Sequence, residues 1–358
     1  MTTITEILKS QGVFQYGVTA LQRPLSLDIY RNWLEEGKHA EMQYLKEHLA
    51  LKAEPERLAE HLNEKQIKKL KTALVIAQDY FPHPHSQKIF KQLPLALYAQ
   101  GEDYHFWFKE KLDKIAENLK EHFPEENFLV FTDSGPILER DLAAQAGIGW
   151  VGKNTCLIHP KKGSLFFIGE ILTSLDLPTN SKPIPDFCGN CTRCLEACPT
   201  QAITKAKEVD ARLCISYWTI ESRQIAPENL RKKFQDCFFG CDICQTLCPW
   251  NEKIFKFSKN IEILSKTNVH NKTETSNEQD LIEDLRFLLT ASGKQIEKRI
   301  FGTALKRAGP FGLRRNALIF IANKKLSRLK PEVEKWSKDP KLGELANWTL
   351  QEISTEKI

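Results

Sequence analysis

Nine of the ten cysteines lie between residues 188 and 248, and thiolates this close together are typical ligands of metals and iron–sulfur clusters. They form two dense motifs, each ending in Cys-Pro: Cys188, Cys191, Cys194 and Cys198 in the first, and Cys241, Cys244 and Cys248 in the second. In two-cluster ferredoxins, three closely spaced thiolates bind one cluster, while the cysteine before proline reaches the neighbouring cluster. The pattern therefore predicts two [4Fe–4S] clusters that exchange ligands.

This exchange assigns all but one of the ligands. The first cluster takes Cys188, Cys191, Cys194 and Cys248, and the second takes Cys198, Cys241 and Cys244. The missing ligand is Cys214 or Cys237, and spacing leaves both open. Cys156 stands apart and is expected to be a buried free thiol. A zinc site, which takes four ligands that typically come as two pairs, is the weaker alternative. Because paired clusters only pass single electrons, a further cofactor or partner is implied.

Two other motifs resemble cofactor sites but lack the required context. Residues 147–152 read GxGxxG, but a helix-like segment precedes them and a strand-like segment follows, the reverse of a dinucleotide-binding turn. We expect these glycines to allow close approach to something flat or large. Asp103, Tyr104 and His105 resemble the start of a DxHxxG cobalamin motif, but Phe108 replaces its glycine. An axial histidine ligand of that type is therefore not supported.

Asp133 is the candidate acid. It follows the apolar run Phe128–Phe131 and precedes Ser-Gly-Pro, so it is expected at the end of a buried strand. Desolvation in a pocket there would raise its pKa and let it donate a proton near neutral pH. The alternative is an Asx-turn that caps the next helix.

The elements that position these residues follow from periodicity. Ala73–Ala77, Phe128–Phe131 and Leu165–Ile168 are expected to be strands, and Tyr104–Lys120 a helix. The proline-rich segment 177–187 predicts a linker, and the polar segment 265–280 a loop. From residue 281 onward, short helices separated by Gly and Pro predict a small helical repeat region.

Composition excludes several classes of protein. A chain of 358 residues is long enough for two or three domains, and 41% hydrophobic with 27% charged residues is typical of a globular protein. No apolar run approaches the roughly 20 residues of a membrane span, and the N-terminus has no secretory signal pattern. We therefore expect a cytoplasmic protein, in which clustered cysteines bind metal or carry out redox chemistry.

Together the motifs resemble the epoxyqueuosine reductase (QueG) family. The resemblance covers nearly the whole chain. It is carried by these segments: TDSGP at 132–136, Glu139-Arg140, GIGWVGKN at 147–154, LIHP at 157–160, Gly163-Ser164, Gly169–Ile171, both cysteine motifs, CISYWTIE at 214–221, FGCDICQTLCPWN at 239–251 and residues 302–323.

The resemblance implies a multidomain α+β fold. Residues 1–180 would form a cobalamin-binding α/β domain similar to those of reductive dehalogenases and nitroreductases. Residues 181–260 would form a ferredoxin-like domain with two [4Fe–4S] clusters, and residues 281–358 would form helical HEAT-like repeats that bind tRNA. The implied enzyme uses cobalamin and both clusters to reduce epoxyqueuosine to queuosine in the anticodon loop of tRNA, the last step of queuosine synthesis.

The resemblance also assigns residues. Cys214 takes the open ligand position, which leaves Cys237 as an extra thiol, and Asp133 matches the proton donor. It also implies a set of residues near positions that line the cobalamin: Arg57, Tyr98, Asp133, Asn154, His159 and Ser216. Arg223 matches a plausible tRNA contact.

Charge supports an RNA partner independently of the resemblance. Residues 294–330 contain eleven basic residues and one acidic residue, a net charge of +10 against +5 for the whole chain. Basic residues on a helical cap suit phosphate contacts. The candidates are Lys306, Arg307, Arg314 and Arg315. A solvated helix face is the alternative. The modified base would be extruded to reach the cobalt.

Two rival functions share some of these features. A reductive dehalogenase-like reductase of a small molecule would use cobalamin and both clusters but would not need the basic tail. A plain electron-transfer module would bind no organic cofactor. For the reductase we expect an external electron donor, no membrane partner and a monomer.

Overall fold

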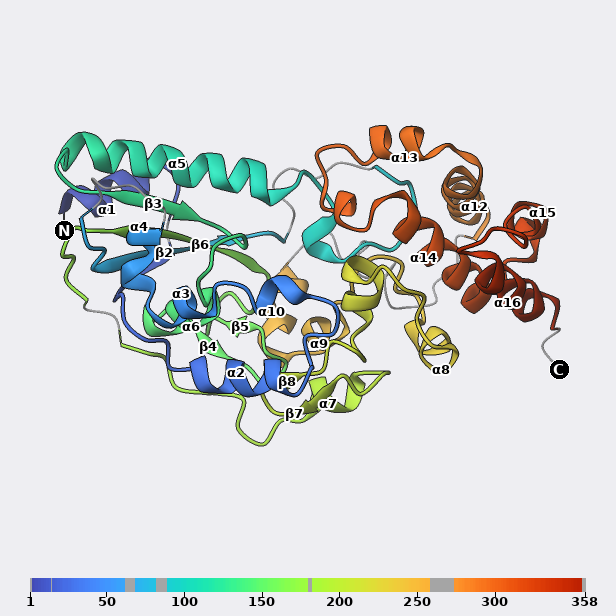
Figure 1. Ribbon diagram of the computed structural model, residues 1–358, viewed down its shortest axis with the longest axis horizontal. Coiled ribbons are helices and arrows are strands. Elements are labelled where there is room, and N and C mark those ends of the chain that lie inside the picture. Colours follow the sequence, from blue (N-terminus) through green and yellow to red (C-terminus); the bar gives the residue numbers. More distant parts are fainter. Residues whose placement is uncertain are drawn as a thin grey trace.

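The computed structural model describes residues 2–13, 15–61, 68–81, 89–179, 182–257 and 274–355. Figure 1 shows an elongated molecule, with a sheet and its flanking helices at the N-terminal end and a group of helices at the C-terminal end. The cysteine-rich segment lies between these two parts. No helix among the described residues is long and apolar enough to cross a membrane.

A four-stranded sheet organises the N-terminal part. Its strands are β1 (Tyr16–Ala20), β2 (Thr72–Asp79), β3 (Phe128–Phe131) and β6 (Phe166–Thr173), in the order β1-β2-β6-β3 with neighbours antiparallel. All three predicted strands are confirmed. The central strands β2 and β6 are apolar on both faces because helices cover both.

The two faces of the sheet pack against different helices (Figure 1). Leu74 and Ile76 of β2 face α1 (Thr2–Ser10) and the long helix α5 (Tyr104–His122), whereas Ala73 and Val75 face the opposite layer, which includes α6 (Glu139–Gln145). Helix α5 confirms the predicted helix. Asp103 caps it by accepting a hydrogen bond from the backbone N–H of His105. The remaining elements of this part are α2 (Leu27–Glu35), α3 (Leu49–Ala53), α4 (Leu58–His61), β4 (Trp150–Val151) and β5 (Leu157–Ile158).

Short elements carry the cysteine motifs. Each motif contains one short helix, α7 (Arg193–Ala197) in the first and α9 (Ile243–Thr246) in the second. These two helices pack together. The hairpin β7–β8 (Ile203–Lys205 and Glu208–Val209) and the π-helical turn Tyr217–Glu221 lie between the motifs in sequence. Two further helices, α8 (Glu228–Arg231) and α10 (Pro249–Phe257), complete this part.

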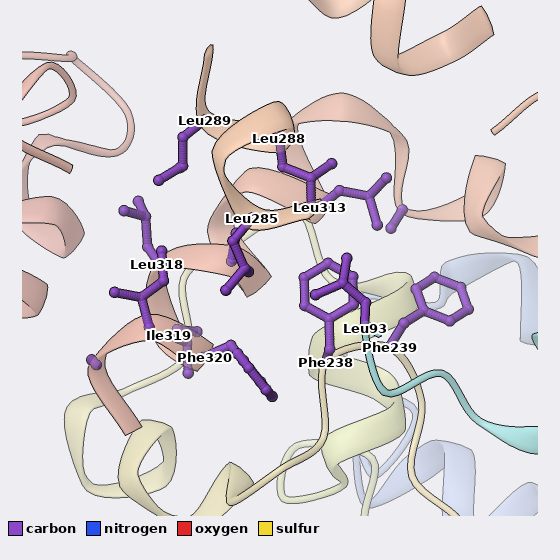
Figure 2. Packing of buried hydrophobic residues seen from close by; sticks show 14 of the residues in the cluster. Leu93, Phe238, Phe239, Leu285, Leu288, Leu289, Leu313, Leu318, Ile319 and Phe320 are labelled. Carbon is purple, nitrogen blue, oxygen red and sulfur yellow. The ribbon is translucent and has the colours of Figure 1, made fainter. Parts of the chain in front are cut away.

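The C-terminal helices share their hydrophobic core with segments from far upstream. Figure 2 shows Leu93, Phe238 and Phe239 packed among leucines of the helical region. Phe238 and Phe239 are fully buried in this core. The helices are α12 (Glu274–Thr290), α13 (Gly293–Arg299), α14 (Gly309–Lys324), α15 (Lys330–Glu334) and α16 (Gly343–Ser354).

One predicted loop is partly wrong. Residues 274–280 of the polar segment 265–280 form the first turns of α12, and residues 265–273 lie outside the described residues. Helix α12 buries Leu285 and Leu288 against α14, so tertiary packing stabilises a helix whose polar N-terminal turns gave no apolar periodicity.

Candidate functional site

A large cavity lies where the three parts meet. Its volume is about 1900 Å³, and its wall includes Asp133 beside the sheet, Val209 of the β7–β8 hairpin and Arg307 of the helical region. Apolar side chains, among them Trp33 and Leu58, line much of the remaining wall. A cavity of this size with a mixed wall suits a large, partly apolar ligand.

Asp133 projects into this cavity from the turn after β3. Its side chain is 60% exposed, so the desolvation expected from its sequence context is not present. The hydroxyl of Tyr104 donates a hydrogen bond of 2.5 Å to Asp133 Oδ2, and His105 Nε2 lies 3.6 Å from the same oxygen. The backbone of Asp133 has a φ of +54°, a left-handed conformation that non-glycine residues seldom adopt and that is common at functional sites.

His105 connects two carboxylates. Its Nδ1 lies 2.7 Å from Asp103 Oδ1, while its Nε2 faces Asp133. Hydrogen bonds to Asp103 first, and then to Asp133, raise the pKa of His105 to about 9. The imidazole is therefore a cation at neutral pH. Sequence reasoning set this motif aside because it lacked the glycine of a cobalamin motif; the signal it missed was two titratable side chains at the start of a long helix.

Two further acids lie behind Asp133. Glu139 Oε1 accepts a hydrogen bond of 2.5 Å from the backbone N–H of Asp133, and burial followed by repulsion from Asp133 raises the pKa of Glu139 to about 8. Glu170 of β6 is fully buried, and neither of its carboxyl oxygens has a hydrogen-bond partner among the described residues. Burial, then Glu139 and Asp133, raise the pKa of Glu170 well above its usual value, which favours the neutral carboxylic acid.

Of the residues expected near cobalamin, the cavity wall includes Tyr98 and Asp133. The other four do not line it. Arg57 is paired with Glu54 and Glu60 on the surface, and Asn154 is buried with its amide donating to the carbonyl of Cys244. His159 and Ser216 also lie away from the wall. His159 Nδ1 accepts hydrogen bonds from the backbone N–H groups of Lys161 and Lys162, and Ser216 begins the π-helical turn.

The glycine run serves the protein's own packing. Gly147 has a φ of +72° and ends helix α6. A Cβ at Gly149 would clash with the carbonyl of Ile158, its neighbour across the β4–β5 pair. The expectation that these glycines allow approach to a flat ligand is therefore wrong for Gly149, because the adjacent strand occupies that space.

The structure brings several thiols of the two motifs close enough to influence one another electrostatically. Burial first, and also the nearby thiols of Cys188 and Cys194, raises the pKa of Cys248 to about 11. Burial likewise raises the pKa of Cys214 to about 11, with Cys241 and Cys198 as its charged neighbours. These neighbours belong to the same predicted ligand sets, and the assignment of the full sets to two clusters is a proposal.

Both spare thiols lie beside the second group. Cys237 contacts Cys241, and Cys156 contacts Cys244 within hydrogen-bonding range. Cys156 is half-buried. It was expected to stand apart because it precedes the motifs by 32 positions in the sequence. The loop between β4 and β5, which contains Cys156, brings this thiol next to the second cysteine motif.

Much of the positive charge of residues 294–330 is neutralised by ion pairs in the fold. Six cations of this basic segment form ion pairs with carboxylates outside the segment: Arg299, Arg307, Lys324, Lys325, Arg328 and Lys330. The charge that remains for a phosphate backbone is therefore much smaller than the +10 counted along the chain.

Two of the predicted RNA contacts are structural in this fold. Arg315 is 1% exposed, and its guanidinium donates to the carbonyls of Ser222 and Gln224. Arg314 donates to backbone carbonyls of Leu288 and Ala291. The Arg315 guanidinium is therefore not free to bind phosphate, which corrects the sequence expectation for this residue. For the half-buried Arg314, the fold uses two of the guanidinium donors internally.

The other three predicted RNA contacts lie on the cavity wall. Lys306 has no ion-pair partner among the described residues. Arg307 pairs with Glu221 at 2.7 Å and stacks over Tyr44, and Arg223 donates to the carbonyls of Arg307 and Ala308.

Comparison with known proteins decides the family. The family model described as Epoxyqueuosine reductase QueG matches residues 48–134, and one described as a 4Fe-4S double cluster binding domain matches residues 187–251. The epoxyqueuosine reductase of Cellulophaga algicola is 36% identical over 285 residues, which cover 79% of this chain and 85% of that protein. The chain belongs to the epoxyqueuosine reductase family. This resemblance, inferred from the motifs, is confirmed, and a small-molecule reductase is not favoured.

Solved epoxyqueuosine reductases have the same fold. One, in complex with an epoxyqueuosine-modified tRNA-Tyr stem loop, has a TM-score of 0.78 and 26% identity, covering 98% of this chain and 89% of that one. The enzyme from Bacillus subtilis, described with its catalytic aspartate loop swung out of the active site, has the same score and identity and covers 98% and 90%. The predicted multidomain α+β fold and the double-cluster segment are confirmed.

Proposed function

We propose that this epoxyqueuosine reductase acts on epoxyqueuosine in the anticodon loop of tRNA, with cobalamin in the central cavity and two [4Fe–4S] clusters beside it. The observation that carries this proposal is the cavity itself, whose wall combines an acid, the hairpin of the cluster segment and basic residues of the helical region. Residues 1–180, 181–260 and 281–358 then supply the cofactor site, the electron path and the RNA contacts.

The wall fits a corrinoid in size and chemistry. Apolar side chains such as Leu25, Ile29 and Trp33 would hold a large macrocycle, and Tyr98 and Asp133 would offer it polar groups from the same wall. Both ring nitrogens of His105 face carboxylates, so this histidine is not an axial ligand. When bound, reduced cobalamin supplies a soft nucleophile or one-electron donor for the strained epoxide.

The protein side of the reaction is proton delivery. Reduction of the epoxide to the alkene consumes two electrons and two protons and releases water. Asp133 is our candidate donor to the epoxide oxygen, since its carboxyl faces the cavity. The Bacillus subtilis relative has a catalytic loop named for an aspartate. We propose that Asp133 corresponds to that aspartate.

The clusters would be bound by the exchanged ligand sets. We propose Cys188, Cys191, Cys194 and Cys248 for one cluster, and Cys198, Cys214, Cys241 and Cys244 for the other. Electrons would come from an external donor, and the enzyme would work as a cytoplasmic monomer.

RNA would approach past Lys306, Arg307 and Arg223. These cations lie on the cavity wall, where phosphates on either side of an extruded nucleotide would pass. The tRNA stem loop bound to the solved relative supports RNA as the substrate.

The test is anaerobic turnover of epoxyqueuosine-containing tRNA by Asp133→Asn enzyme loaded with cobalamin and both clusters. We expect loss of roughly 10²- to 10⁴-fold in kcat, the usual contribution of a general acid. Asp113→Asn, a change at an exposed aspartate on α5 paired with Lys109, is the matched control. Normal turnover by Asp133→Asn would exclude Asp133 as the donor.

A further inference from the structure

Asp103, His105 and Asp133 form a continuous chain of proton-carrying groups that ends in the cavity. Asp103 Oδ1 and His105 Nδ1 are 2.7 Å apart, and His105 Nε2 is 3.6 Å from Asp133 Oδ2. A carboxylate on one imidazole nitrogen orients the ring and leaves the other nitrogen to transfer a proton. The 3.6 Å separation suits a site without substrate, where such hydrogen bonds are often long.

The fold fixes each member of this chain. Asp103 is the N-cap of α5 and also accepts the backbone N–H of His105 at 3.1 Å, which limits its side chain to one orientation. The ring of Tyr104 is sandwiched between His105 and Phe167, with centroid distances of 4.2 and 4.1 Å. The imidazole therefore has little freedom to turn away from Asp133.

The charges around His105 favour its cationic form overall. Three carboxyl groups lie near it, on the helix N-cap, the turn after β3 and helix α6, and one lysine lies near the N-cap. These groups, with the neighbouring phenol, are Asp103, Asp133, Glu139, Lys306 and Tyr104.

The reaction creates a need for such a chain. A carboxyl group can hold only one proton at a time, but each turnover consumes two. After the first transfer Asp133 is a carboxylate, which the hydroxyl of Tyr104 stabilises without giving up its own proton, because burial and the charge of Asp133 raise the pKa of Tyr104 well above its usual value. A proton must therefore return to Asp133, and His105 is the titratable side chain placed beside it to deliver one.

We propose that Asp103 and His105 form a relay that reloads Asp133 with the second proton of each turnover. This inference rests on the proposed donor role of Asp133. In the step, the Nε2–H bond of the imidazolium breaks and an O–H bond forms at Asp133 Oδ2. The product is a neutral imidazole whose Nδ1–H remains hydrogen-bonded to the Asp103 carboxylate. His105 takes its next proton from water at the open cavity, and no electrons are exchanged.

Asp103→Asn is the first test. Asparagine is as good an N-cap as aspartate, so α5 is retained, but the main cause of the raised His105 pKa is lost. We expect kcat of the wild-type holoenzyme to fall with increasing pH near 9, where His105 loses its proton. In Asp103→Asn this alkaline limb should move toward about 6.5, the ordinary pKa of histidine. A purely structural role of Asp103 would lower kcat without moving the limb.

His105→Gln tests the relay directly. Glutamine keeps a polar group at the site but carries no titratable proton, so kcat should fall on the order of 10²-fold and the alkaline limb should disappear. In His105→Ala, added imidazole should restore part of the rate. His122→Gln on the same helix, where His122 is exposed, is the matched control and should behave as the wild type.

A second readout does not depend on activity. Diethyl pyrocarbonate modifies only neutral imidazole, so peptide mass spectrometry of the modified holoenzyme across pH measures the protonation of His105. We expect half-maximal reactivity of His105 near pH 9 in the wild type and at lower pH in Asp103→Asn and Asp133→Asn.

The outcomes separate the two proposals. If Asp133→Asn retains normal turnover, the donor role fails and the relay fails with it. If Asp133→Asn is inactive while His105→Gln keeps the wild-type kcat and alkaline limb, the relay alone is wrong. An alkaline limb that stays in place in Asp103→Asn, with His105 reactivity unchanged, also overturns the relay.

Discussion

The hydroxyl of Tyr104 donates a 2.5 Å hydrogen bond to the carboxylate of Asp133, joining the first turn of α5 to the turn after β3. The two residues come together because α5 packs on the sheet over the neighbouring strands β3 and β6. The bond limits the rotation of a carboxylate that is otherwise largely exposed to the cavity.

Tyr104→Phe should therefore impair catalysis without unfolding the protein. The ring keeps its stacking on Phe167, but a hydrogen bond to a charged group, about 1.5–3 kcal/mol, is lost. We expect kcat to fall by roughly 10-fold or more, with little change in melting temperature. Tyr16→Phe serves as the control, since it removes a phenol hydroxyl of the edge strand β1 that is hydrogen-bonded to Thr5. Equal turnover by Tyr104→Phe and wild type would mean that the bond does not position Asp133.

Iron content should distinguish the ligand from the spare thiol in the second cluster. Because Cys198 and Cys241 are electrostatic neighbours of Cys214, Cys214→Ser should lose about half of the bound iron, as expected when one of two equal clusters is lost. Cys237→Ser should retain all of it. The measurement is iron and sulfide per chain after anaerobic reconstitution, together with the electron paramagnetic resonance of the reduced protein. The opposite result for the two variants would assign the ligand to Cys237.

Lys306 and Arg315 should have opposite effects, although both belong to the basic segment. Lys306→Ala removes an unpaired cation from the cavity wall, so tRNA binding should weaken severalfold. The slope of log K against log salt should fall by about 1. The fold should be unaffected. Binding measured over a range of salt concentrations checks this, and an unchanged slope would place Lys306 outside the RNA interface.

Arg315→Leu should instead destabilise the fold. It leaves the buried carbonyl of Ser222 without its donor, which costs on the order of 1–3 kcal/mol, and it also removes the part-buried bond to the carbonyl of Gln224. We expect a lower melting temperature, with the salt slope of tRNA binding unchanged in the folded fraction. A variant as stable as the wild type but weak in binding would restore Arg315 to the RNA interface.

Glu170→Gln should stabilise the protein, and more so as pH rises. The pKa of this carboxyl is raised in the folded state by burial, so above the pKa of the unfolded chain only the unfolded form ionises. Stability contributed by this group is therefore present at low pH and lost as pH increases. The melting temperature of Glu170→Gln relative to wild type should be higher at pH 8 than at pH 5. Glu121→Gln, at an exposed position on α5, is the control, and a pH-independent difference would mean that Glu170 is ionised in the fold.

The sequence alone determined the family and the two-cluster segment. It also determined the main strands and the long helix of the N-terminal part. These depend on local signals: the spacing of cysteines around Cys-Pro, and alternating or helical apolar periodicity in segments such as 73–77 and 104–120. Thiols of both cysteine motifs are also electrostatic neighbours in the fold, as for Cys248 with Cys188 and Cys194.

Only the tertiary structure decided which side chains meet at long range. His105 and Asp133 are 28 positions apart in the sequence, and their approach depends on how α5 packs beside β3. The charge of residues 294–330 likewise depended on partners supplied by distant elements, such as Glu221 for Arg307 and Glu352 for Lys325. Charge along a chain is a sum, but charge in a fold depends on which carboxylate lies within a few ångströms, and packing decides that.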